Sequence, residues 1–325
     1  MSIKVLITDG MAENGLEVLK KHPEFEVDHR KSVDASELKK IIGSYQAIVI
    51  RSATTLTKEI LENATEMKLI VRAGAGVDNI DVEYATERKI PVMNTASANS
   101  LAAAEQTIAL MFAMLRFLPQ AAMSLKDGKW DRKTYTGYEV TGKTLSVIGL
   151  GNIGRIVCEK AMGLGMNVIG YDPMIQSADT LPESLKKNPE SFQLVTNLDD
   201  AFKKADILTV HVPKNEKTTN LINSESLSKM QKGSWVINVA RGGIVNEKDV
   251  MEACDSGQLS GAAFDVYDPE PPQFPNPLFT HPKVVCAPHL GASTHEAQTR
   301  VASTAAEQMV GFFKREEKTG VINLK

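Results

Sequence analysis

The fold is decided by the stretch Leu145-Ser146-Val147-Ile148-Gly149-Leu150-Gly151-Asn152-Ile153-Gly154. Its first four residues are a short apolar run typical of a buried strand, and a helical pattern with Ile156 and Val157 follows the last glycine. The next apolar run ends at Asp172, 18 residues after Gly154. Dinucleotide-binding units have this order: a strand, a Gly-x-Gly-x-x-Gly turn, a helix, a second strand and then an acid about 20 residues on.

Each part of this motif has a chemical reason. Gly149, Gly151 and Gly154 allow a tight turn, close approach of the backbone to a pyrophosphate, and close packing of helix on strand. The helix N-terminus supplies N–H donors and a positive dipole. Asp172 is expected to bind both hydroxyls of the adenosine ribose, and Pro173-Met174-Ile175-Gln176 holds no Arg or Lys for a 2′-phosphate. We therefore expect NAD, not NADP, as the cofactor.

Apolar runs alternate with helical patterns on both sides of the motif, which indicates an α/β fold with parallel sheets. Strands are expected at Val5–Ile7, Phe25–Val27, Ala47–Ile50, Leu69–Val71, Leu145–Ile148, Asn167–Tyr171, Ile207–Val210, Trp235–Val239, Gly261–Phe264 and Val284–Ala287.

Two further segments predict how the domains are divided. A long Ala/Leu/Met-rich helix, Leu101–Leu118, reads as a crossover between domains, and the helical pattern Thr294–Arg315 is expected to return to the first domain. We thus expect two parallel-sheet domains, a Rossmann cofactor domain (99–291) inserted in a flavodoxin-like substrate domain (1–98 plus 292–325). Asp179–Pro189 is expected to be a surface loop.

Composition excludes several classes of protein. The 325 residues carry 37 Lys+Arg against 40 Asp+Glu, a net charge of −3 without a long basic run, so neither nucleic acid nor an anionic membrane is expected as a partner. The three cysteines stand far apart, which predicts no metal site and no disulfide framework. With no basic-then-apolar leader at the start, we expect a cytoplasmic protein.

Three ionisable residues follow strands of the expected cofactor sheet, at the edge where ligands bind in such sheets. Arg241 precedes Gly242-Gly243 and suits a substrate carboxylate, which it would bind bidentately. His289 is the candidate acid/base, and Glu270, in a proline-rich segment, would orient the imidazole and stabilise its charged form. Together they suit hydride exchange on a 2-hydroxy acid; unrelated surface charges are the alternative. His211 is expected to be structural.

Four motifs in this order resemble the D-isomer-specific 2-hydroxyacid dehydrogenase family: Gly149–Gly154, Asn238–Gly243, Phe264–Pro271 with its Asp265 and Glu270, and Pro288–Gly291. The likeness covers essentially the whole chain. It implies that Arg241, Glu270 and His289 are catalytic. It also implies that the NAD site is lined by Asn152, Ile153, Asp172, Val212, Pro213, Ala240, Asp265 and Gly291, with Asp265 on the nicotinamide carboxamide.

Within the family the likeness is greatest to the members that oxidise D-3-phosphoglycerate at the start of the phosphorylated route to L-serine. It rests on Ile50–Thr54, Val71–Asn79, Asn99–Glu105 and Lys126–Trp130. By this likeness Arg51 would contact the phosphate, the backbone of Gly74, Ala75 and Gly76 the carboxylate, and Asn99 a substrate oxygen. Arg132 is a further phosphate candidate, with a surface salt bridge as the alternative.

The resemblance also carries expectations on assembly and regulation. Longer members have a regulatory domain after the final helix, whereas this chain ends at Lys325, so serine feedback through such a domain is expected to be absent. Ala75 replaces a hydroxyl residue of the anion-binding loop. The family habit predicts a homodimer through the cofactor domain, with the helix Leu101–Leu118 as one interface candidate and core packing as its alternative.

Two other functions remain open. A glyoxylate or hydroxypyruvate reductase of the same family would share the three catalytic residues, need no phosphate pocket and often use NADPH; Asp172 and Arg51 argue against it. An NAD-sensing binding protein of the corepressor type would share the fold, but the chain lacks the extended tails expected there.

Overall fold

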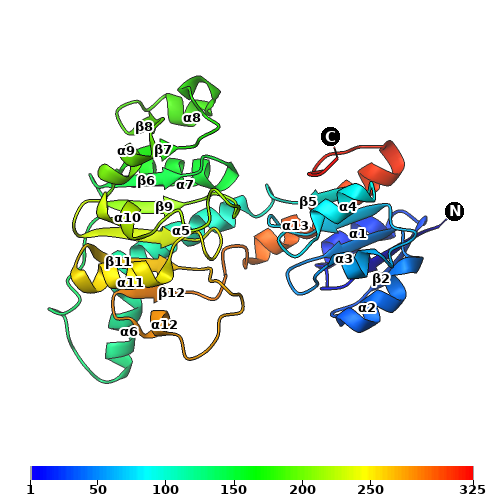
Figure 1. The fold of residues 1–325 in the computed structure, drawn as a ribbon, viewed down its shortest axis with the longest axis horizontal. Helices are drawn as coiled ribbons and strands as arrows, with labels where there is room; N and C mark the ends of the chain where they lie inside the picture. The colour runs from blue at the N-terminus through cyan, green and yellow to red at the C-terminus, as the bar shows by residue number, and fades with distance from the viewer. Residues whose placement is uncertain (1, 325) are drawn as a thin grey trace. The chain divides into compact units, whose positions relative to one another are not determined.

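A computed structural model describes residues 2–324 and divides the chain into two compact units. One unit holds the residues through Asn99 together with those from Ala292 onward, and the other comprises Ser100–Gly291. Each is built on a single sheet in which every strand pair is parallel, with helices around it (Figure 1). The expected α/β fold with two parallel sheets is confirmed.

The first unit has a five-stranded sheet with the strand order β2-β1-β3-β4-β5, which is the flavodoxin-like order. Its elements are β1 (Ile3–Ile7), α1 (Glu13–Lys20), β2 (Phe25–His29), α2 (Ala35–Ile41), η1 (Ile42–Ser44), β3 (Ala47–Ile50), α3 (Lys58–Leu61), β4 (Leu69–Arg72), α4 (Val82–Glu87), β5 (Val92–Asn94) and α13 (His295–Arg315).

The strands of this unit are apolar at successive positions because both faces of the sheet are covered. Val5 and Ile7 belong to the apolar core on one face, whereas Leu6 belongs to the core on the other. The first of these cores includes residues of α13, such as Ala305 and Met309, so the unit is completed by residues far along the chain.

Helix α13 packs directly on α1, as Figure 1 shows by the orange-to-red helix beside the blue one. A side chain at Gly15 of α1 would place its Cβ 2.8 Å from the carbonyl oxygen of Ala302, so only glycine allows this approach. Thr294 caps α13 by accepting the N–H of Ala297 at 3.1 Å, as its sequence position predicts.

The second unit has a seven-stranded sheet with the order β12-β11-β10-β9-β6-β7-β8, the Rossmann order with one strand added. Its elements are α5 (Ser100–Leu115), α6 (Leu118–Lys126), β6 (Thr144–Ile148), α7 (Asn152–Gly163), β7 (Asn167–Tyr171), η2 (Ala178–Thr180), α8 (Glu183–Lys186), β8 (Phe192–Val195), α9 (Leu198–Lys203), β9 (Ile207–Val210), α10 (Ser224–Ser228), β10 (Ser234–Asn238), α11 (Glu247–Ser256), β11 (Leu259–Phe264), α12 (Pro277–Thr280) and β12 (Val284–Cys286).

Two parts of the secondary structure differ from the sequence expectation. The segment expected to be a surface loop, Asp179–Pro189, contains α8 and the end of η2. These elements are short and consist mostly of polar, exposed residues, so the sequence shows no apolar periodicity that would predict a helix there. Strand β8 was not expected at all: it is an edge strand, so it needs few apolar residues, and only Phe192 and Val195 are buried.

Helix α5 belongs to the core of the second unit. Its residues Leu110, Met111, Met114 and Leu115 are buried, so core packing, the alternative to an interface helix, describes most of its apolar surface. No single helix among residues 2–324 is long and apolar enough to span a membrane. The pair α5 and α6 reaches that length and composition only when the two are joined across a 59° bend.

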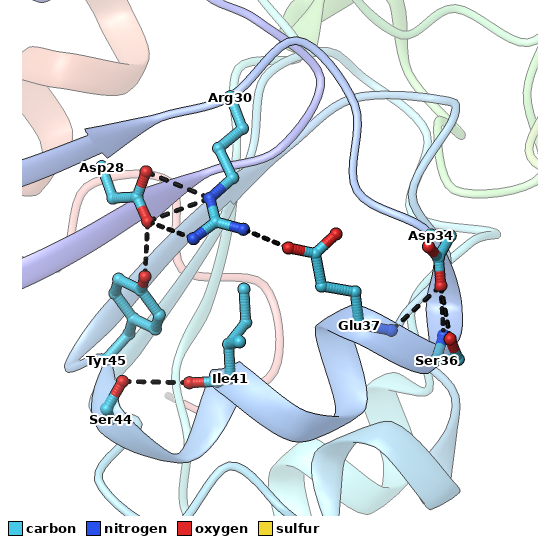
Figure 2. A network of polar contacts seen from close by, with 8 residues as sticks. All are labelled: Asp28, Arg30, Asp34, Ser36, Glu37, Ile41, Ser44 and Tyr45. Carbon is cyan, nitrogen blue, oxygen red and sulfur yellow. Dashed lines mark hydrogen bonds and ion pairs between the residues drawn. The ribbon is translucent and has the colours of Figure 1, made fainter.

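A polar network fastens the edge strand β2 of the first unit to the segment that follows it (Figure 2). Asp28 accepts hydrogen bonds from the Tyr45 hydroxyl at 2.6 Å and from Arg30 Nη2 at 2.8 Å, and Arg30 Nη1 donates to Glu37 at 2.6 Å. The Arg30 guanidinium, together with the Tyr45 hydroxyl, lowers the pKa of Asp28 below its ordinary value of 3.8.

This network generates a stability prediction. Asp28→Asn should lower the free energy of unfolding by about 1 kcal/mol, since a charged acceptor is lost at a partly exposed site. Because the folded-state pKa is lowered, the contribution is present above the ordinary carboxyl pKa and is lost as the pH falls through the lowered value. Urea unfolding at pH 7 and at stepwise lower pH should therefore show the difference from the wild type shrinking in acid; a constant difference would contradict the ionic origin.

Candidate active site

The glycine-rich turn joins β6 to α7 in the way that the motif predicts. Gly149 has φ +97°, and a Cβ there would lie 2.5 Å from the carbonyl oxygen of His211 at the end of β9. A Cβ at Gly154 would lie 1.9 Å from the carbonyl oxygen of Gly149. Both positions therefore require glycine, the first for its backbone angle and its neighbour, the second for the close packing of helix on turn.

Gly151 differs from these two glycines because the space beside it is open. A Cβ there would meet no atom within 4 Å. Gly151 is also the N-cap residue of α7, and no side chain caps the helix. The first-turn N–H groups of a twelve-residue helix thus adjoin an open space, as a bound pyrophosphate requires. Gly149–Gly154 therefore fits a dinucleotide.

Asp172, just beyond β7, holds this turn from the neighbouring strand. Its Oδ2 accepts the N–H of Leu150 at 2.9 Å, and its Oδ1 accepts the N–H of Met174 at 2.9 Å. Each carboxylate oxygen can accept more than one hydrogen bond, so both retain capacity for the ribose hydroxyls. Asp172 thus organises the turn, and ribose binding stays a prediction.

Arg241 is positioned by the close approach of two segments that follow β10 and β11. A Cβ at Gly242 would lie 1.7 Å from the carbonyl oxygen of Tyr267, so the two backbones are in direct contact. The buried side chain of Asn238 fixes the turn, since it donates to the carbonyl of Arg241 at 2.9 Å and accepts from the N–H of Ala240 at 3.1 Å. The Arg241 side chain is thereby set beside the segment that carries Glu270.

Glu270 and His289 form a hydrogen-bonded pair with a defined geometry. The Glu270 Oε2 lies 2.8 Å from His289 Nδ1, and its Oε1 accepts the N–H of Tyr267 at 2.9 Å. Burial opposes ionisation of Glu270, but the bonds from His289 and the Tyr267 backbone, with the charges of His289 and Arg241, lower its pKa overall. An ionised carboxylate can only accept, so Nδ1 carries the proton and Nε2 presents a lone pair.

The turn that presents His289 is fixed by Asp265, which follows β11. Its two oxygens accept the N–H groups of Leu290 at 2.8 Å and Gly291 at 2.7 Å, and Gln106 of α5 donates to it at 3.3 Å. Desolvation raises the pKa of Asp265 above its ordinary value. His289 itself has φ +54°, an uncommon backbone conformation that these bonds hold in place.

Asp265 is fully buried, and its two oxygens hold the turn that carries His289. Its contact with the nicotinamide carboxamide, which the resemblance implies, stays a prediction. Neither Gln106 nor Tyr267 was singled out from the sequence, because no motif marks them. The hydrogen bonds of the Gln106 amide and of the Tyr267 hydroxyl depend on the packed fold.

His211 is structural in character, as expected. Its Nε2 lies 3.0 Å from the Thr209 hydroxyl, its Nδ1 is buried without a partner among the described residues, and desolvation lowers its pKa to about 3. It is therefore neutral at neutral pH. The other residues assigned to the NAD site lie near the carboxyl ends of β6, β9, β10 and β12: exposed or half-buried Asn152, Ile153, Val212 and Pro213, and buried Ala240 and Gly291.

Apart from Arg241, the residues expected to bind substrate fall in the first unit, near the carboxyl ends of β3 and β4 and at its last residue before α5. Half-buried Arg51 follows β3. Gly74, with φ +149°, lies against the guanidinium of Arg72, a residue the sequence analysis did not single out. Asn94 donates to the carbonyl of Ala75 at 2.8 Å. Asn99 is buried, and its Oδ1 has no hydrogen-bond partner among the residues described.

Unit by unit, the structure thus collects the predicted residues at sheet edges. In the second unit it pairs Glu270 with His289 and sets Arg241 near them; in the first it places Arg51 and the Gly74–Gly76 loop on adjacent strand ends. Arg132 lies exposed in the segment after α6. No group of three or more His, Cys, Asp or Glu side chains in residues 2–324 is arranged to hold a metal ion.

Known proteins match this chain over nearly its whole length. It is 42% identical over 322 residues to the D-3-phosphoglycerate dehydrogenase of Methanocaldococcus jannaschii, covering 99% of this chain and 60% of that protein. For the Bacillus subtilis protein of the same name the identity is 37%, covering 99% and 59%. The chain therefore spans about three fifths of the length of these curated relatives.

A solved structure and a family model agree with this assignment. The crystal structure of a glyoxylate reductase from Paecilomyes thermophila has a TM-score of 0.87 at 27% identity, covering 99% of this chain and 98% of that one. Residues 108–291, more than half of the chain, match the model for the NAD-binding domain of D-isomer specific 2-hydroxyacid dehydrogenases. The chain belongs to the D-isomer specific 2-hydroxyacid dehydrogenase family, and its second unit carries the family's NAD-binding domain.

Proposed function

We propose that this protein oxidises D-3-phosphoglycerate to 3-phosphohydroxypyruvate with NAD, the first step of the phosphorylated route to L-serine. The observation that carries the proposal is the hydrogen bond between Glu270 and His289 near Arg241, at the carboxyl edge of a dinucleotide-binding sheet. The relatives named D-3-phosphoglycerate dehydrogenase support the substrate, since the match covers the first unit with Arg51 as well as the second.

The residues of the second unit suit this chemistry. Arg241 binds the substrate carboxylate with two parallel N–H donors and thereby orients the C2 carbon. His289 Nε2 takes the proton of the C2 hydroxyl, while Glu270 stabilises the imidazolium that forms. NAD, when bound, supplies the acceptor for the hydride that leaves C2. In reverse, the imidazolium returns the proton to the carbonyl oxygen.

Asp172 supports NAD over NADP in this proposal. Its carboxylate already accepts two backbone N–H groups, so it is held at the end of β7 where a 2′-phosphate would meet a negative charge. Met174, the residue that follows the turn, is apolar and 88% exposed, and so offers no compensating cation.

The first unit would bind the phosphate through Arg51. The Gly74–Gly76 backbone would supply N–H donors to the substrate carboxylate, and Asn99 Oδ1, buried without a partner among the described residues, would accept a substrate hydroxyl. The cytoplasmic location expected from the unpaired cysteines stays a prediction.

We also propose a homodimer formed through the second unit, with α6 at the interface. Leu118, Met123 and Leu125 of this helix are 54%, 57% and 58% exposed, and Trp130 after it is 76% exposed. Leu118 and Leu125 share one side of the helix while Met123 lies on another, so α6 presents apolar side chains that are more than half exposed on two of its sides. A second copy of the chain would cover them.

The substrate assignment predicts the outcome of a spectrophotometric panel. Purified protein should reduce NAD with D-3-phosphoglycerate, and Arg51→Ala should raise the KM for this substrate about 10- to 100-fold, since a charged hydrogen bond is lost. The KM for hydroxypyruvate with NADH should stay unchanged. Turnover only on glyoxylate or hydroxypyruvate would favour the reductase, and NAD binding without any turnover would favour a sensing protein.

The role of His289 predicts a separation of catalysis from binding. His289→Gln should lower kcat by about 10²- to 10⁴-fold, because the general base is lost. NAD binding, followed by protein fluorescence, should stay near the wild-type affinity, since His289 is not placed in the glycine-rich turn. Glu270→Gln should lower kcat by less. Activity retained in His289→Gln would refute the assignment.

The interface predicts a change of oligomeric state. Leu118→Lys with Leu125→Lys should convert the dimer to a monomer in light scattering after size exclusion, because two lysines cannot be buried against a second copy. Met174→Lys is the matched control, since this exposed methionine lies outside α6. A wild-type monomer, or a dimer unaffected by the double variant, would contradict this interface.

A further inference from the structure

The turn that carries Arg51 is held on its N–H side by Asp9, which follows β1. Asp9 Oδ2 accepts the backbone N–H of Arg51 at 2.6 Å and that of Thr54 at 3.1 Å. Its Oδ1 accepts the Thr54 hydroxyl at 2.6 Å, and that hydroxyl also lies 2.8 Å from the hydroxyl of buried Thr8. One carboxylate thus binds three donors of the segment Arg51–Thr54.

The same turn is held on its carbonyl side by Asn79, which lies beyond the Gly74–Gly76 loop. Asn79 Nδ2 donates to the carbonyl of Arg51 at 2.7 Å and to that of Thr54 at 2.5 Å. The backbone carbonyl of Asn79 accepts the N–H of Leu56 at 2.8 Å, which ties the loop to the end of the turn. Arg51 and Thr54 therefore each have both backbone polar groups bound by these two side chains.

This arrangement fixes a segment that has no regular structure of its own. Arg51–Thr54 lies between β3 and α3, so no strand or helix ladder satisfies its backbone. Two bonds from a carboxylate and two from an amide replace that ladder, and the charged ones are the stronger. Because they set the backbone of Arg51, they set the direction in which its side chain leaves the turn.

Arg51 and Asp9 also border the same cavity in the first unit. The cavity has a volume of about 280 Å³, and Gly10 and Gln298 line it as well. Both oxygens of Asp9 accept hydrogen bonds from the turn, so the carboxylate is directed at the backbone of Arg51–Thr54. Arg51 is a cation among the residues that line this cavity.

We propose that Asp9 and Asn79 are positioning residues, which fix the turn Arg51–Thr54 so that the Arg51 guanidinium is preset for the substrate phosphate. The inference rests on the proposed function, because it takes the phosphate as the partner of Arg51. Neither residue needs to touch the substrate; both act through the backbone of Arg51.

Two single variants test the positioning role of Asp9 and Asn79 by comparing its effect on KM with its effect on kcat. Asp9→Asn keeps the size of the side chain but leaves one backbone N–H of the turn facing the NH₂ of an amide. Asn79→Leu keeps the volume of the side chain but removes the two hydrogen bonds that Asn79 donates to the carbonyls of Arg51 and Thr54. Each should raise the KM for D-3-phosphoglycerate about tenfold. The kcat, the KM for NAD and the KM for hydroxypyruvate should each stay within about twofold of the wild type.

A double-mutant cycle decides whether the effect passes through Arg51. In the Arg51→Ala background, Asp9→Asn and Asn79→Leu should change the KM for D-3-phosphoglycerate by less than about twofold, since the side chain that they position is gone. Effects that multiply with that of Arg51→Ala would overturn the inference. Equal rises in KM for phosphorylated and unphosphorylated substrates would overturn it as well.

Asp28→Asn is the matched control. It removes another acceptor carboxylate, within β2 of the same sheet, and its bonds go to Arg30 and Tyr45, not to the Arg51 turn. It should lower stability without raising the KM for D-3-phosphoglycerate; a rise there would show that the KM reports only loosened packing. If Asp9→Asn does not fold, Asn79→Leu carries the cycle.

The proposed function and this inference fail in different ways. A wild-type enzyme that oxidises D-3-phosphoglycerate while the cycle is multiplicative refutes the positioning role alone. A wild-type protein that neither oxidises D-3-phosphoglycerate nor binds it in calorimetry refutes the proposed function, and the inference falls with it.

Discussion

The parallel direction of every strand pair is the constraint on which the site depends. When all strands of a sheet run the same way, every carboxyl end lies at the same edge, and residues far apart in sequence become neighbours there. In the second unit this edge receives Gly149, Asp172, Arg241, Glu270 and His289, which follow five different strands. The parallel topology of the sheet thus brings the residues of the site together, and the individual side chains then determine the chemistry.

The position of His289 at this edge is fixed by side chains that do not themselves react with the substrate. Asp265 binds the two amides after His289, while Glu270 binds its ring, so the imidazole is fixed from its backbone and from Nδ1. Tyr267 links Glu270 to the segment before His289. Its N–H donates to Glu270, and its hydroxyl donates to the carbonyl of Ala287 at 2.8 Å. A base held in this way keeps its Nδ1 proton toward Glu270 throughout the reaction, so Nε2 is the nitrogen that gains and loses the substrate proton.

The sequence predicted those features that local pattern controls. The strand–turn–helix of Gly149–Gly154 and the parallel sheets follow from apolar runs and glycine spacing. The structure divides the chain after Asn99 and after Gly291, and divisions after residues 98 and 291 had been expected. The pairing of Glu270 with His289 was an expectation from chemistry and resemblance that spacing alone could not supply.

The contacts that the sequence could not predict are those made by tertiary packing. Nothing near Asp9, Asn79 or Gln106 in the chain marks their partners, which lie 25 to 159 positions away. The same holds for Asp265, whose bonds to the N–H groups of Leu290 and Gly291 depend on the packed fold. The sequence did not predict edge strand β8, because a strand that is covered on one side only needs few apolar residues.

The reach of α13 back to the first unit sets an order on synthesis at the ribosome. The early part of the chain lacks Ala305, Met309 and their neighbours until α13 has been made, so its apolar face stays uncovered while the whole of Ser100–Gly291 is already available to fold. The inserted unit can therefore mature first, and the core of the amino-terminal segment stays open until α13 has left the ribosome.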